Sequence, residues 1–233
     1  MTHPLIVSYY TPGTAYEDHA SALKASVDRL GLDSRIEPRA PKSSWVENCA
    51  QKALFVRDMR QQDERPILWI DADAILRRKV TELERFSGDF AVVKRGGWSF
   101  YGGQAYFGSG PNAEDLIERW CRYCTDYPNI WDQVSLGYAW WDASLETDLQ
   151  ALWLEPGLFA KSKRNFLGRY VQGAFSKAAI VHKQESRRSK AAQRAPRQSE
   201  FSNDHLPEWW RRAAALDQPF VLDEARKHEL GLL

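Results

Sequence analysis

Short apolar runs alternate with stretches of helical periodicity in the first part of the chain. Residues 5–10 and 34–39 are predicted strands. Between them, apolar residues at helical spacing predict a helix over 16–30 that ends at Gly31. A second helix is predicted over 48–62. This strand–helix–strand order is typical of the start of a parallel sheet in an α/β fold.

The apolar run Ile-Leu-Trp-Ile at residues 67–70 leads directly into Asp71 and Asp73. Such a run predicts a strand buried on both faces. Residues two apart on a strand point the same way, so we expect both carboxylates to project together from its C-terminal end, where open α/β sheets bind ligands. Paired carboxylates suit a hard divalent cation and, through it, a diphosphate. The alternative is that Asp73 only caps a turn.

The later predicted elements are shorter. Residues 96–110 are rich in glycine and aromatic residues and predict a hairpin whose backbone approaches a ligand closely. Neither a phosphate-binding P-loop nor a dinucleotide-binding glycine fingerprint is present, which argues against a P-loop nucleotidase and a Rossmann dehydrogenase. The remaining predictions are a helical turn at 80–86, strands at 89–94, 152–154 and 179–183, and helices over 112–127 and from 131.

Three single residues are candidates for chemistry. His182 ends the last predicted strand, and an imidazole beside two carboxylates would favour Mn²⁺ over Mg²⁺; otherwise it is a structural histidine. Asp132 stands at the start of a predicted helix, as a catalytic carboxylate or a helix cap. Lys52 lies on a predicted helix, where it is either solvated or turned toward the site to bind phosphate.

The cysteines favour a reduced protein. Cys121 and Cys124 form a Cys-x-x-Cys inside a predicted helix, and without a second pair we expect buried thiols rather than a zinc or redox centre. Cys49 is the only other cysteine, and no basic-then-apolar leader begins the chain, so we expect a cytoplasmic location. No apolar run approaches the roughly 20 residues of a membrane span.

The charge distribution is uneven although the net charge is only +1. Residues 161–197 carry eleven Lys and Arg against one acid, whereas residues 1–160 have a net charge of −6. A basic segment after an acidic body indicates an anionic ligand or partner. Residues 191–199 are a predicted linker, and 206–216 and 223–230 are predicted helices of a small appendage.

The order of these features resembles the nucleotide-diphospho-sugar transferases of GT-A fold, and in particular glycosyltransferase family 8 with related small bacterial and phage enzymes. The resemblance rests on the strand-borne Asp71-Ala-Asp73, the glycine and aromatic segment, Asp132-Gln133 and the late Ile-Val-His182. It implies a GT-A-type, Rossmann-like domain over residues 1–190 with a mixed, mostly parallel central sheet flanked by helices. Residues 191–233 would be a linker and a small C-terminal helical appendage.

The resemblance also implies a role for individual residues. Asp71, Asp73 and His182 would hold Mn²⁺ (or Mg²⁺) against the diphosphate of the donor. Asp132 and Gln133 would lie beside the transferred sugar as the catalytic pair. Other residues would contact the nucleotide, the phosphates or the sugar: Tyr9, Tyr10, Thr11, Tyr16, Lys52, Gly102, Gly103, Gln104, Lys183, Arg187 and Arg188.

The implied activity is transfer of a sugar from a nucleotide-diphosphate sugar, by default a UDP-sugar, to an acceptor hydroxyl with retention. We expect a saccharide or small molecule as acceptor. The alternative acceptor is a hydroxymethylated base in phage-type DNA, held by the basic residues 161–197 and flipped out of the duplex. A different class also stays open, a non-catalytic nucleotide- or DNA-binding module in which the two carboxylates are structural.

Overall fold

The computed structural model describes residues 3–43, 45–94, 100–127, 132–161 and 177–183. Arg187, Arg188, the predicted linker and appendage (191–233) and most of the basic segment lie outside these residues. Among the residues that the structure describes, no helix is both long and apolar enough to cross a membrane.

The core of the molecule is a six-stranded sheet. β6 is antiparallel to both neighbours, whereas the other five strands run in one direction. The predicted α/β fold with a mixed, mostly parallel sheet is therefore confirmed. In spatial order the strands are β2 (Ser34–Pro38), β1 (Leu5–Tyr10), β3 (Ile67–Ile70), β6 (Gln104–Phe107), β5 (Phe90–Val92) and β7 (Ala151–Trp153).

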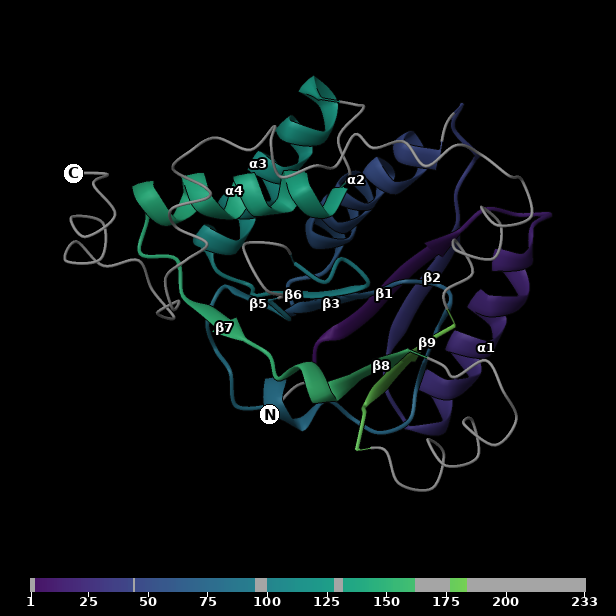
Figure 1. Cartoon of the computed structure of the whole chain (residues 1–233). Coiled ribbons are helices and arrows are strands. Elements are labelled where there is room, and N and C mark those ends of the chain that lie inside the picture. The colour runs from purple at the N-terminus through teal and green to yellow at the C-terminus, as the bar shows by residue number, and fades with distance from the viewer. Residues whose placement is uncertain (1–2, 44, 95–99, 128–131, 162–176, 184–233) are drawn as a thin grey trace.

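Helices cover both faces of this sheet (Figure 1). On β3, Ile67 and Trp69 pack into one core cluster and Leu68 and Ile70 into another, as expected for a strand buried on both sides. The first cluster lies under α2, α3 and α4, and the second lies under α1. The helices are α1 (Ala15–Arg29), α2 (Trp45–Gln62), α3 (Pro111–Asp126) and α4 (Asp132–Glu146), with 3-10 turns at Thr81–Leu83 and Pro156–Leu158.

A second, three-stranded sheet has the order β4 (Ala74–Leu76), β9 (Ile180–His182) and β8 (Phe159–Lys161). The strand at β9 was predicted, whereas β4 and β8 were not. β4 is antiparallel to β9, and Ala74 lies opposite His182. This pairing joins segments about a hundred residues apart and places His182 beside the chain that follows Asp73.

Several local predictions need correction. β3 ends at Ile70, so Asp71 and Asp73 lie in a turn closed by a hydrogen bond from the Ala74 amide to the Asp71 carbonyl (3.0 Å), not on the strand. Helix α3 begins at Pro111 rather than at residue 112, with Gly110 as its N-cap. The hairpin predicted over 96–110 falls partly outside the described residues, and the later part of that segment contains β6, an interior strand between β3 and β5.

Candidate active site

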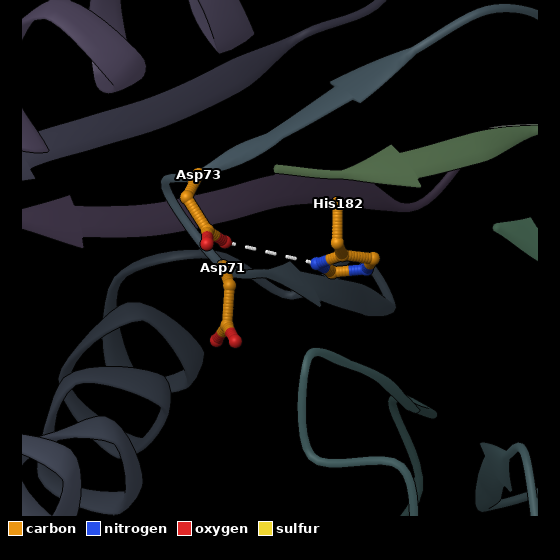
Figure 2. Close-up of side chains that lie close together, drawn as sticks. All are labelled: Asp71, Asp73 and His182. Atoms are coloured by element: carbon orange, nitrogen blue, oxygen red, sulfur yellow. Dashed lines mark ion pairs between the residues drawn. The ribbon is translucent and has the colours of Figure 1, made fainter. Parts of the chain in front are cut away.

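Asp71, Asp73 and His182 lie together at the C-terminal end of β3. One ligand atom from each lies within 4.8 Å of the other two. Asp73 and His182 are 7% and 4% exposed, whereas the Asp71 side chain is 36% exposed. Figure 2 shows Asp73 and His182 facing each other. The cluster is therefore anchored in the protein on one side and open to a ligand on the other.

The spacing of this cluster fits a divalent cation. Asp73 Oδ1 and His182 Nδ1 are 3.8 Å apart, too far for a direct hydrogen bond. Two atoms that each lie about 2.1 Å from one ion are separated by about 3–4 Å, which matches this gap. Two carboxylates and one imidazole are a donor set that suits Mn²⁺. Asp73 and His182 thus lie at a separation that suits a shared ion, and Asp71 offers a third ligand atom within 4.8 Å of both.

Gln104 and Gly103 fix the imidazole of His182. His182 Nε2 donates to Gln104 Oε1 across 2.8 Å, and Gln104 is fully buried. In the neutral imidazole this hydrogen bond places the ring proton on Nε2, so that Nδ1 faces Asp73 with its lone pair, as a metal ligand requires. Gly103 packs against the flat ring, since a Cβ there would lie 2.6 Å from His182 Cε1. Gln104 orients the histidine, and its predicted place beside the sugar stays a prediction.

Lys52 is turned toward the site and is not a solvated lysine. From α2, its ammonium reaches Asp132 Oδ2 at 2.8 Å, Asp71 Oδ1 at 3.1 Å and the Gly102 carbonyl at 2.8 Å. Burial alone would lower the pKa of Lys52, but Asp132 and Asp71 raise it well above its usual value. Burial also raises the pKa of Asp132, against the opposing effect of Lys52. The three side chains form one charge network, in which Lys52 and Asp132 are buried and Asp71 is partly exposed.

Asp132 and Gln133 begin α4 and lie against the glycine segment. Asp132 is 6% exposed, and its backbone carbonyl accepts a hydrogen bond from Trp120 Nε1 (2.8 Å). A Cβ on Gly102 would lie 2.9 Å from Gln133 Cβ, so only glycine lets the two segments approach this closely. Asp132 is therefore a buried, ion-paired carboxylate rather than a surface helix cap.

The residues predicted to contact the nucleotide lie at the same edge of the sheet. Tyr9 is at the end of β1, packs its ring against Phe55 and Trp69, and donates its hydroxyl to the Asn48 carbonyl. Tyr10 and Thr11 follow it and are partly exposed. Their position is compatible with the prediction, but no ligand contact tests it.

Tyr16 and Lys183 both lie next to His19. The Tyr16 and His19 rings are 6.3 Å apart, and Lys183 Nζ lies 3.3 Å from His19 Nδ1. The Lys183 amide also donates to the Asp73 carbonyl (2.8 Å). The start of α1 and the end of β9 thus meet beside the metal cluster, and the predicted donor contacts of Tyr16 and Lys183 stay predictions.

Two features of the site were missed in the sequence. Trp69 Nε1 donates a hydrogen bond to Asp71 Oδ1 (3.0 Å). This contact holds the first carboxylate of the Asp71-Ala-Asp73 motif in place. His19 contacts Lys183 across 164 positions of sequence. The spacing of Trp69 two residues before Asp71 was a usable signal, whereas nothing in the sequence pointed to His19.

The buried cysteines are not part of any site. Cys121 and Cys124 are free thiols on α3, and burial raises the pKa of each to about 12. The predicted buried thiols are confirmed. Among the described residues, the metal cluster at the end of β3 is the only group of at least three acidic, histidine or cysteine side chains close enough to share an ion.

Comparison with known proteins identifies the fold. No protein-family profile matches this sequence, and no curated protein matches it either. Among solved structures, a glycosyltransferase involved in glycosylation of the major capsid of PBCV-1 has a TM-score of 0.61 at 12% identity, covering 83% of this chain and 100% of that one. The apo form of the glycosyltransferase GlyE of Streptococcus pneumoniae TIGR4 has a TM-score of 0.51 at 14% identity, covering 99% of this chain and 64% of that one. With its mixed sheet and its Asp-x-Asp turn after β3, the chain has the GT-A glycosyltransferase fold.

Proposed function

We propose that this protein is a metal-dependent glycosyltransferase that moves a sugar from a nucleoside-diphosphate sugar, with UDP as the default nucleotide, to an acceptor hydroxyl. The observation that carries the proposal is the Asp71, Asp73 and His182 cluster at the C-terminal end of β3. In a GT-A fold, that edge of the sheet is where a diphosphate would be expected. A module in which Asp71 and Asp73 are only structural would not need a buried histidine placed beside them with a ring nitrogen facing Asp73.

The chemistry that the protein must support is cleavage of the bond between the anomeric carbon and the diphosphate. A divalent ion bound by Asp71, Asp73 and His182 would neutralise charge on the leaving diphosphate. Lys183, which lies beside Asp73, would add a positive charge at the same place. Tyr10 and Thr11, at the end of the adjacent strand β1, would line the nucleotide.

Lys52 has a positioning role in this proposal. An ammonium has three donors, and Lys52 Nζ already has three oxygen partners in Gly102, Asp71 and Asp132. Its positive charge is therefore already paired inside the site, and its predicted contact with the donor stays a prediction. Its place between the two carboxylates fixes the distance from the metal ligand Asp71 to Asp132.

The same ion pair favours retention. An inverting enzyme needs a free carboxylate base within reach of the acceptor hydroxyl. Asp132 is buried and paired with Lys52 at 2.8 Å, so it is poorly placed to take that proton. We propose that the departing phosphate takes the proton from the acceptor, while Asp132 and Gln133 hold sugar and acceptor together and exclude water.

The direct test is donor turnover by the full-length chain. UDP-, GDP- and dTDP-sugars are incubated with the protein and Mn²⁺, and released nucleoside diphosphate is measured. We expect release from one donor that requires Mn²⁺ and is lost in Asp73→Asn. Asp28→Asn, which removes an exposed carboxylate on α1, is the matched control and should keep full activity. A rate equal to that without protein for every donor would contradict the proposal.

A further inference from the structure

Three tyrosine rings form a row on the outer side of α3 and α4. Tyr127 stacks on Tyr123 (centroids 6.0 Å apart, planes at 27°), and Tyr123 stacks on Tyr138 (5.6 Å, 23°). The Tyr123 hydroxyl donates to the Asp142 carboxylate, which fixes the middle ring. Tyr127 ends the row and is 52% exposed, the only large hydrophobic side chain so exposed among the described residues. Its outer face is available to a ligand.

A hollow of about 300 Å³ lies beside this row. An aromatic surface with a few hydrogen-bonding side chains is typical of a site for a small polar molecule. Arg122 and Asp126 are exposed at the rim and offer donors and acceptors. The residues that line the hollow are Arg119, Arg122, Tyr123, Asp126, Tyr127 and Asp142.

Both a sugar ring and a nucleobase stack on tyrosine, and the charges around the hollow favour the sugar. The residues that line the hollow include two arginines and two aspartates, so their formal charges cancel. Arg119 is already paired with Asp115 and Glu146, each at 2.6 Å. Binding of a nucleic acid relies on unpaired cations for the phosphates. A sugar needs hydrogen-bonding partners for its hydroxyl groups. It also needs a surface for its weakly positive C–H groups, which the negative face of the tyrosine ring provides.

The hollow is connected to the reaction centre by α4. Asp132 begins this helix, and Tyr138 and Asp142 lie six and ten residues later, about 9 and 15 Å along the helix axis. A ligand in the hollow is therefore too far away to be the sugar that reacts. The distance instead suits another unit of the same glycan.

We propose that the hollow between α3 and α4 binds a sugar unit of a glycan acceptor on the outer face of Tyr127, away from the bond that is formed. The acceptor would then be a chain of several sugars. That the bound glycan is an acceptor rests on the proposed function. Glycan binding at Tyr127 does not depend on the proposed function.

The test is calorimetric titration of the full-length chain without donor or metal. The probes are maltohexaose, cellohexaose and chitohexaose. We expect at least one to bind, and Tyr127→Ala to weaken that binding by about tenfold, because a stacking partner is lost. Tyr127→Trp, which keeps an aromatic face, should restore binding, and Lys24→Ala on α1 is the surface control. Circular dichroism verifies that each variant is folded.

Three results would overturn the inference: no binding of any hexasaccharide, equal binding by Tyr127→Ala, or Tyr127-dependent binding of an oligothymidylate in place of a sugar. The two proposals also fail separately. Tyr127-dependent glycan binding without donor turnover would leave this site standing and remove the proposed function. Donor turnover without glycan binding would do the reverse.

Discussion

The His182 imidazole donates from Nε2 to Gln104 Oε1 across 2.8 Å, with both side chains buried. In the neutral imidazole this contact decides which ring nitrogen carries the proton, and the other nitrogen, Nδ1, faces Asp73 at 3.8 Å. Outer contacts of this kind commonly contribute a factor of 10–100 to metal affinity.

Gln104→Met, which keeps the size but removes the acceptor, should therefore weaken Mn²⁺ binding by about 10–100-fold. Gln104→Glu keeps an acceptor oxygen and should retain most of the affinity. Mn²⁺ titrations followed by electron paramagnetic resonance measure both variants. Unchanged affinity in Gln104→Met would mean that the hydrogen bond does not select the tautomer.

Gly103→Ala should displace the imidazole. The new Cβ would lie 2.6 Å from His182 Cε1, so ring or backbone must move, at a cost of about 1–3 kcal/mol in the free energy of unfolding. Gly157→Ala is the matched control, since a Cβ there meets nothing within 4 Å. Urea unfolding and Mn²⁺ titration report the two effects. Equal stability of both variants would refute the close approach.

Lys52→Met should leave Asp132 buried without its cation. Removal of one partner of a buried pair costs about 3–5 kcal/mol. Adding Asp132→Asn removes the stranded charge, so the double variant should regain much of this stability while donor turnover stays absent. Urea unfolding of the single and double variants tests the network. A Lys52→Met protein as stable as the wild type would contradict it.

The two thiols on α3 should resist alkylation at pH 8. Burial raises the pKa of Cys121 and Cys124 to about 12, and only the thiolate reacts. The thiolate fraction therefore becomes appreciable only as the pH approaches 12. Iodoacetamide labelling followed by peptide mass spectrometry should modify Cys49 alone. Rapid modification of Cys121 or Cys124 would show that this helix is not packed as described.

The elements that could be predicted from sequence are those with strong local patterns. β3 and β9 are largely apolar runs, and the residues predicted at their C-terminal ends, Asp71, Asp73 and His182, do come together. The stated reason was partly wrong, since the two carboxylates share a turn rather than one face of a strand. Helices α1, α2, α3 and α4 differ from their predictions only at their ends.

What could not be predicted depends on contacts between distant residues. β4 is three residues long and exists because it pairs with β9. In the sequence, Lys52 cannot be told from an ordinary helix lysine. Its role depends on Asp132, which is eighty positions later in the chain and lies 2.8 Å from it in the structure. Gln104 lies in a segment read as a ligand-binding hairpin, and its role depends on His182. The predictions for Arg187, Arg188 and the appendage stay predictions, as does the cytoplasmic location.

The central claim is that the Asp-x-Asp turn binds a nucleotide sugar through a metal. The most direct test is calorimetric titration of UDP, GDP and their sugar conjugates, with and without Mn²⁺, on the wild type and Asp73→Ala. We predict that one nucleotide family binds the wild type only when Mn²⁺ is present, and that Asp73→Ala abolishes this binding. Nucleotide binding that ignores both Mn²⁺ and Asp73, or no nucleotide binding at all, would contradict the account.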